Sequence, residues 1–163
     1  MSLFLGKLEL NGKCHIMGIL NITPDSFYDG GWHFDLVSTQ KRVKEMIDEG
    51  VEIIDIGGES TRPGSKPVTV KEELERVIPV IEFVKSISDI PISIDTQKAE
   101  VARKAVEAGA CVVNDVGGLR NNDMISAIAE MKIPVIIMHM QGTPENMQKD
   151  PHYDNTVLDI KNW

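Results

Sequence analysis

The sequence predicts an α/β protein built around a parallel β-sheet. Five short apolar runs rich in branched residues recur along the chain, and segments with helical spacing of apolar residues separate them. Short and wholly apolar runs are typical of parallel strands that are covered on both faces. No linker or low-complexity tract interrupts the 163 residues, so we expect one domain over residues 1–163. Periodicity leaves open whether the sheet is an open sheet or a closed barrel.

Each predicted strand runs directly into a polar or glycine-rich loop. The strands are expected at Cys14–Leu20, Val51–Ile56, Pro91–Ile94, Cys111–Val113 and Pro134–Met138. Before the first of them, Leu8–Leu10 followed by Asn11 and Gly12 predicts a small hairpin.

The predicted helices have recognisable ends. Asp35 can cap a helix that ends at Gly50, and Thr69 with Glu72 forms a capping box for the second helix. Pro79 should kink or split that second helix. The remaining helices are expected from Thr96 as the cap to Gly109, from about Asn122 to Met131, and from near Asn155 onward.

Composition excludes several functional classes. The net charge of −8 argues against a non-specific nucleic-acid binder, and no apolar run approaches the roughly 20 residues of a membrane span. Residues Met1–Lys13 lack the features of a secretory signal. Cys14 and Cys111 lie far apart within apolar runs, so we expect buried, reduced thiols. We therefore expect a cytoplasmic protein that binds neither membrane nor nucleic acid.

Polar side chains recur where the strands end, and in a parallel α/β fold these positions share the carboxyl edge of the sheet. Asp95 and Asn114 follow the third and fourth strands. A carboxylate can accept a pair of parallel N–H bonds from an amino-heterocycle, and a carboxamide beside it can donate and accept. The pair therefore predicts a site for a planar, guanidine-like or pterin-like ring. Asp55 is interpreted as a structural carboxylate whose hydrogen bonds are satisfied. His139 follows the fifth strand, and the sequence leaves open whether it faces the site.

Two loops at the same edge contain candidate binding groups. Gly57 and Gly58 allow close approach of the backbone, and the Ser60–Arg62 segment that follows offers donors to an anion. In the loop after the first strand, Asn21 and Asp25 offer hard oxygen ligands for Mg²⁺ holding a phosphate. Two such oxygens are not a metal motif by themselves.

Two motifs resemble fingerprints of the dihydropteroate synthase family. They read MGILNITPDSF at residues 17–27 and DIGGESTRPG at residues 55–64. Three shorter segments continue the resemblance in the family's order: SIDT at 93–96, VND at 113–115 and MHMQGTP at 138–144. The resemblance runs from about residue 14 to about residue 148.

The resemblance implies a TIM (β/α)₈ barrel, of which this chain covers about the first five βα units. It implies condensation of 4-aminobenzoate with 7,8-dihydropterin-6-ylmethyl diphosphate, giving 7,8-dihydropteroate and pyrophosphate in folate synthesis. It further implies Mg²⁺, a sulfonamide target and a homodimer at full length. The residues implied in substrate binding are Phe27, Thr61, Arg62, Pro63, Asp95, Asn114 and Met138, with Arg62, Asp95 and Asn114 taken as catalytic and Asn21 at the metal.

The length departs from the family pattern, because a TIM barrel needs about 250 residues. Three further βα units are expected but absent from this sequence, and with them a later pterin-contacting Asp, a Ser-Arg-Lys segment and an Arg-x-His. We expect the chain to be the N-terminal portion of a synthase and to be inactive alone. Two alternatives stay open: a non-catalytic pterin-binding module and a pterin-dependent methyltransferase.

Overall fold

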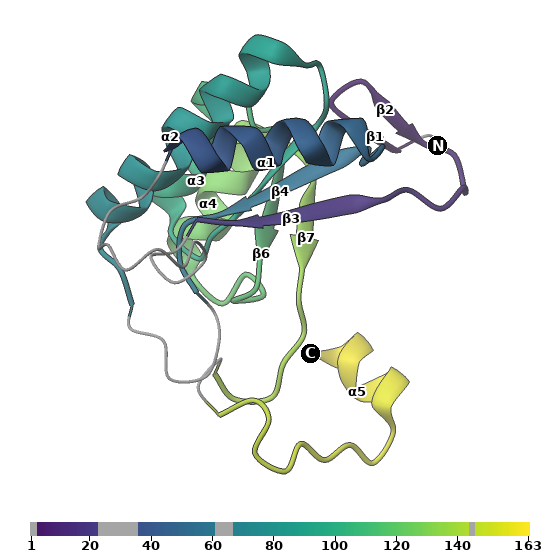
Figure 1. Ribbon diagram of the computed structural model, residues 1–163. Coiled ribbons are helices and arrows are strands. Elements are labelled where there is room, and N and C mark those ends of the chain that lie inside the picture. The colour runs from purple at the N-terminus through teal and green to yellow at the C-terminus, as the bar shows by residue number, and fades with distance from the viewer. Residues whose placement is uncertain (1–2, 23–35, 61–66, 144–145) are drawn as a thin grey trace.

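A computed structural model describes residues 3–22, 36–60, 67–143 and 146–163 of the chain. Within these ranges a parallel five-stranded sheet is covered on one face by four helices (Figure 1). The strands are β3 (Met17–Asn21), β4 (Ile53–Gly57), β5 (Ile92–Asp95), β6 (Val112–Asp115) and β7 (Val135–Ile137). The helices are α1 (Leu36–Asp48), α2 (Val70–Ile87), α3 (Ala99–Ala108) and α4 (Asn122–Met131). All five predicted strands are thus confirmed, with shifts of a few residues at their ends.

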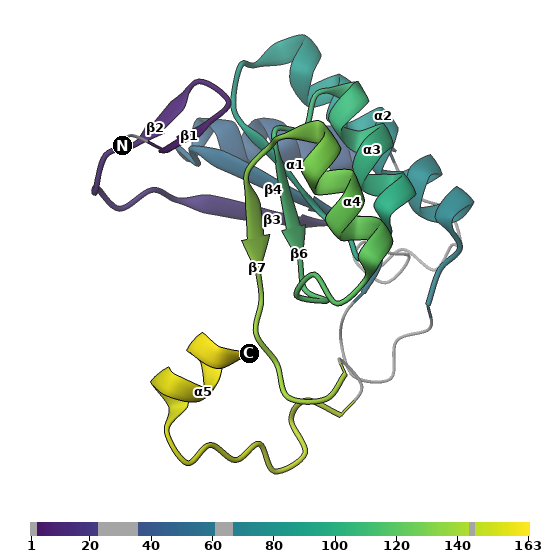
Figure 2. The same ribbon diagram turned by 180° about the vertical axis from the view of Figure 1, so that it is seen from behind.

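The strand order decides between an open sheet and a barrel. The strands pair in sequence order, β3-β4-β5-β6-β7, and every pairing is parallel. A doubly wound open sheet reverses its strand order and carries helices on both faces, whereas a barrel keeps sequence order with its helices outside. Here α1 to α4 lie on the same side of the sheet in both views (Figures 1 and 2). The predicted incomplete barrel of five βα units is therefore confirmed.

The main core lies between the sheet and these helices. Its fully buried members include branched strand residues and one stripe of α2, among them Ile54, Ile56, Ile92, Ile94, Val77 and Ile81. Because strand side chains alternate, Asp55 and Ser93 point to the opposite side of the sheet. We call that side, away from α1–α4, the inner face.

A hairpin of β1 (Leu3–Leu5) and β2 (Leu8–Leu10) packs on the amino-terminal end of the inner face, where Leu5 forms a small cluster with Ile53 and Val112. The hairpin was expected, but its turn was misplaced. The chain turns before Leu8, at Gly6, whose φ of +58° suits the first central position of a type II′ turn. Asn11 and Gly12 follow β2 and connect it to β3.

The helix ends follow the sequence with two exceptions. The Thr69–Glu72 capping box is present, but α2 continues through Pro79 without a split, because the buried stripe holds the helix on both sides of the proline. Thr96 does not cap α3: its Oγ1 accepts from the Lys98 amide in a local turn, and the helix begins at Ala99.

The other predicted helix ends agree with the structure. Gly109, with φ of +123°, ends α3, and α4 has the predicted bounds. A short helix α5 (Thr156–Asn162) begins after Asn155, as expected. Asp35 lies outside the described residues.

The expectation for the cysteines holds in part. Both are free thiols, but Cys14 is exposed because it precedes β3 instead of lying within it, and Cys111 is half-buried. Burial raises the pKa of the Cys111 thiol, although its contact with the Ile92 carbonyl acts in the opposite direction. Among the helices of the described ranges, none is long and apolar enough to cross a membrane.

Candidate functional site

Four strand-end residues form one row across the sheet. Asn21 pairs with Gly57, Gly57 with Asp95, and Asp95 with Asn114. Residues at paired positions of neighbouring strands project to the same face, here the inner face. The expectation that these strand ends share one edge is therefore confirmed, and we call them the strand-end row.

Gly57 keeps the middle of this row open. A Cβ atom placed on Gly57 would lie 3.4 Å from Asn21 Oδ1 and 3.4 Å from Asp95 Oδ2, so both oxygens lean over the glycine. Gly58 has a different role, because a Cβ there would lie 2.9 Å from Val77 Cγ1. The close approach expected at Gly58 is thus made by helix α2.

Asp55 lies one step deeper on the inner face and holds Asn114. The Asn114 Nδ2 group donates to Asp55 Oδ2 at 3.0 Å. Asp55 is only 4% exposed, and its Oδ1 has no hydrogen-bond partner within the described ranges. The interpretation of Asp55 as a satisfied carboxylate is therefore right for one oxygen and wrong for the other.

Asp95 also carries an oxygen without a partner. Its Oδ1 is buried, and the described part of the chain offers it no donor. Burial, followed by the like charges of Asp55 and Glu73, raises the pKa of Asp95 to about 7. A buried acceptor without a donor is unfavourable, so this position suits a ligand that supplies N–H groups.

A partly buried ion cluster lies near Asp95 of the strand-end row, and it was not predicted from the sequence. Lys98 Nζ lies 2.6 Å from Glu73 Oε2 and also bonds Glu59. Burial lowers the pKa of Lys98, but the hydrogen bonds to Glu59 and Glu73 outweigh it and raise that pKa. The positive charge of Lys98 is thus paired with two carboxylates. One signal was available: Glu73 occupies the buried stripe of α2 four positions before Val77.

The loop after β6 is held by Asp115. Its Oδ1 accepts from the Gly117 amide at 2.8 Å and its Oδ2 from the Leu119 amide at 2.7 Å. Leu119 has a φ of +57°, a left-handed conformation that is unfavourable for a branched side chain. Asp115 therefore stabilises a strained loop directly beside Asn114.

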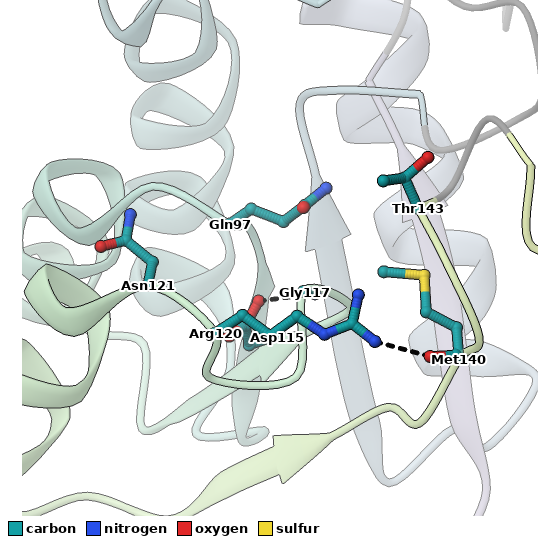
Figure 3. A pocket seen from close by; sticks show the side chains of 7 residues that line it. All are labelled: Gln97, Asp115, Gly117, Arg120, Asn121, Met140 and Thr143. Carbon is teal, nitrogen blue, oxygen red and sulfur yellow. Dashed lines mark hydrogen bonds between the residues drawn. The ribbon is translucent and has the colours of Figure 1, made fainter. Parts of the chain in front are cut away.

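Arg120 ties this loop to the segment after β7. Its guanidinium donates to the Met140 carbonyl at 2.6 Å (Figure 3) and also to the Gly142 carbonyl. A cavity of about 310 Å³ lies between the two segments. It is lined by Gln97, Asp115, Gly117, Arg120, Asn121, Met140 and Thr143 (Figure 3). Asp95 and Asn114 are not part of that lining, so the cavity adjoins the strand-end row without containing it.

Met138 and His139 follow β7. The Met138 amide donates to the Asp115 carbonyl at 3.3 Å, and a Cβ on Gly118 would lie 2.8 Å from the Met138 carbonyl oxygen, so the two segments pack closely. His139 packs against the C-terminal segment: its Nε2 lies 3.1 Å from Tyr153 Oη, and its ring meets Trp163 edge-on at 4.7 Å.

Several predicted site residues lie outside the described residues. These are Phe27, Thr61, Arg62 and Pro63, together with Asp25. Their roles stay predictions. In the part of the chain that is described, no group of three or more His, Cys, Asp or Glu residues is arranged to hold a metal ion.

Comparison with known proteins identifies the family of the chain. Residues 17–163 match the family model described as pterin binding enzyme. The chain belongs to the pterin binding enzyme family. Among curated members, it is 48% identical over 164 residues to the dihydropteroate synthase of Escherichia coli (strain K12), and 46% identical over 160 residues to that of Haemophilus influenzae. These alignments cover 100% and 94% of this chain, and 58% of each relative.

Solved members of the family have the same fold. A Yersinia pestis dihydropteroate synthase in complex with a sulfonamide drug superposes with a TM-score of 0.89 at 44% identity, covering 99% of this chain and 59% of that one. A Xanthomonas albilineans dihydropteroate synthase with 4-aminobenzoic acid gives 0.84 at 42% identity, covering 99% and 57%. The chain thus spans somewhat more than half the length of the family members that it matches.

Proposed function

We propose that this chain is the pterin-binding part of a dihydropteroate synthase. The observation that carries the proposal is a pair of buried oxygens, Asp55 Oδ1 and Asp95 Oδ1, beside the Asn114 carboxamide; neither oxygen has a donor among the described residues. The family match and the names of its relatives support the same function.

The ring edge of a pterin is complementary to this arrangement. It carries an exocyclic amino group next to ring nitrogens, and a carboxylate such as that of Asp95 can accept two parallel N–H bonds from such an edge. Asn114 lies next to Asp95 in the row and contacts the same edge. Met138, which packs against the loop after β6, contributes an apolar contact to the ring.

The reaction that follows is a displacement at carbon. The amine of 4-aminobenzoate attacks the methylene carbon attached to the dihydropterin ring and forms a C–N bond. The C–O bond to the diphosphate breaks, its electron pair leaves with pyrophosphate, and the amine gives up a proton. In this proposal Asp95 and Asn114 hold the pterin. From the resemblance to the family, Thr61 and Arg62 are assigned to the leaving group and the aminobenzoate, and Phe27 and Pro63 to the walls of the aminobenzoate site. No covalent protein nucleophile is required.

Mg²⁺ fits the exposed end of the row. Asn21 is exposed and directs Oδ1 over Gly57, toward the same point as Asp95 Oδ2. Mg²⁺ at phosphate groups keeps several waters and needs only one or two protein oxygens, which Asn21 can supply in part. When bound, the ion would neutralise charge on the diphosphate. We further propose a cytoplasmic protein that is a homodimer at full length.

Turnover tests the proposal. The protein, expressed at the length of its relatives, is expected to release pyrophosphate only when both 4-aminobenzoate and the dihydropterin diphosphate are present, and Asp95→Ala is expected to abolish that release. The absence of turnover in the unaltered protein would contradict the proposal. Methyl transfer from methyltetrahydrofolate would favour a methyltransferase instead.

A further inference from the structure

We propose that Asp55 is a positioning residue that sets the orientation of the Asn114 carboxamide, and thereby makes the site select ring edges rich in N–H donors. The inference rests on the proposed function and extends it: besides offering its own Oδ1, Asp55 acts on the ligand through the carboxamide of Asn114.

The geometry joins two strands that are not neighbours. Asp55 belongs to β4 and Asn114 to β6, and β5 lies between them. In the register Asp55 is paired with Ser93, one layer deeper than the pair of Asp95 and Asn114. The 3.0 Å bond from Asn114 Nδ2 to Asp55 Oδ2 therefore reaches across the inner face from the deeper layer.

The chemistry of the pair fixes which end of the amide faces Asp55. An ionised carboxylate only accepts hydrogen bonds, so only the NH₂ group of Asn114 can form this contact. The reversed amide would bring two acceptor oxygens together at a buried position, which is unfavourable. Asn114 Oδ1 consequently points away from Asp55, and no described residue donates to it.

The result is a site that presents acceptors. Asn114 Oδ1 joins Asp95 Oδ1 and Asp55 Oδ1, and none of the three has a donor from the described part of the protein. A ring edge with several N–H groups satisfies such a set, whereas an edge that presents a carbonyl oxygen in place of an amino group leaves acceptor facing acceptor. Discrimination between these edges thus depends on Asp55 through Asn114.

The experiment compares two ligands and several variants in the full-length protein. Pterin carries an amino group where lumazine carries an oxygen, so the ratio of their affinities, measured by calorimetry, reports the polarity of the site. Asp55→Asn has the same shape as the native residue but can donate to Asn114 Oδ1 and turn the amide round. We expect it to reduce the preference for pterin over lumazine by about tenfold or more.

Matched variants separate positioning from a general structural effect. Asp55→Ala frees the Asn114 amide without adding a donor and is expected to reduce the preference in the same direction. Asp55→Glu keeps an acceptor and is expected to retain the preference. Ser93→Ala alters the register partner of Asp55. Ser93 is also buried, but its hydroxyl has no hydrogen bond to Asn114 or to any other described residue, so this variant is expected to leave both affinities unchanged.

A double-mutant cycle identifies the route of the effect. If Asp55 acts through Asn114, the Asp55→Asn substitution changes the pterin-to-lumazine ratio less than about twofold when Asn114→Ala is already present. An unchanged ratio in folded Asp55→Asn and Asp55→Ala, with normal pterin binding by the unaltered protein, overturns the inference and leaves the proposed function standing. Failure of the unaltered protein to bind pterin overturns both.

Discussion

Asp95 and Asp115 end two neighbouring strands, β5 and β6, yet their carboxylates are used in opposite ways. Each oxygen of Asp115 accepts one backbone amide of the following loop, whereas Asp95 Oδ1 is buried with no donor from the described residues. Since Asn114 is the register partner of Asp95, the next residue, Asp115, faces the helix side of the sheet. The comparison separates a carboxylate that holds the fold from one that is left available for a ligand.

Glu73 lies between these two cases, because one of its oxygens is paired with Lys98 and the other has no partner among the described residues. Removing its partner Lys98 gives the largest expected effect on stability. Lys98→Met would remove the cation that pairs with the fully buried Glu73 carboxylate. We expect a loss of about 4 kcal/mol in the free energy of unfolding, measured by urea denaturation. Lys104→Met, which breaks an exposed pair with Glu107, is the control and should cost less than about 1 kcal/mol.

Asp115→Ala tests the structural member of the pair. It leaves the Gly117 and Leu119 amides without an acceptor and removes the restraint on the left-handed Leu119. We expect a loss of about 3 kcal/mol in the free energy of unfolding. Asp115→Asn keeps one acceptor oxygen and should lose less. A loss below about 1 kcal/mol in Asp115→Ala would show that Asp115 does not hold the loop.

Asp95→Ala tests the other member. We expect pterin affinity to fall about 100-fold, near 2.7 kcal/mol, because paired hydrogen bonds to the ring edge are lost. The free energy of unfolding should not fall, since the substitution removes an oxygen that has no partner in the described part of the chain. Calorimetry and urea denaturation on the same samples measure both quantities. Unchanged pterin affinity would place the pocket elsewhere.

The pH dependence of stability gives the smallest of these effects. The pKa of Asp95 is raised to about 7 in the folded protein, above the value of about 3.9 in an unfolded chain. The folded state therefore binds the proton more tightly, and this contribution to stability is lost as the pH rises from about 4 to about 7. We expect Asp95→Asn to gain about 2 kcal/mol over the unaltered protein at pH 8 relative to pH 5.5. An equal difference at both pH values would contradict the shifted pKa.

Local patterns in the sequence predicted local features of the structure well. The capping box at Thr69 and the bounds of α4 depend on residues a few positions apart, and both are confirmed. The strand-end row was predicted because parallel strands must share a carboxyl edge. Thr96 was misread because its hydroxyl has two local options, an N-cap or the turn to Lys98, and spacing does not choose between them.

Features that depend on distant partners were not predictable in the same way. Lys98 and Glu73 are 25 positions apart, and only the packing of α2 beside α3 brings them together. Asn114 and Asp115 are neighbouring polar residues at the end of β6, and the sequence does not distinguish them. They point to opposite faces of the sheet because side chains alternate along a strand, and the register of β6 decides which of them faces inward. The open oxygen of Asp55 likewise depends on the reach of Asn114 across β5.

The sequential order of the five strands has a consequence for folding. Each strand pairs only with strands adjacent to it along the chain, so each pairing needs only one strand–helix–strand segment and no distant part of the chain. Asp95 and Asn114 are about twenty positions apart and need only β5, α3 and β6 to meet. We expect this half of the row to acquire hydrogen-exchange protection during refolding without waiting for β3. The strand order thus allows Asp95 and Asn114 to come together before the rest of the strand-end row has formed.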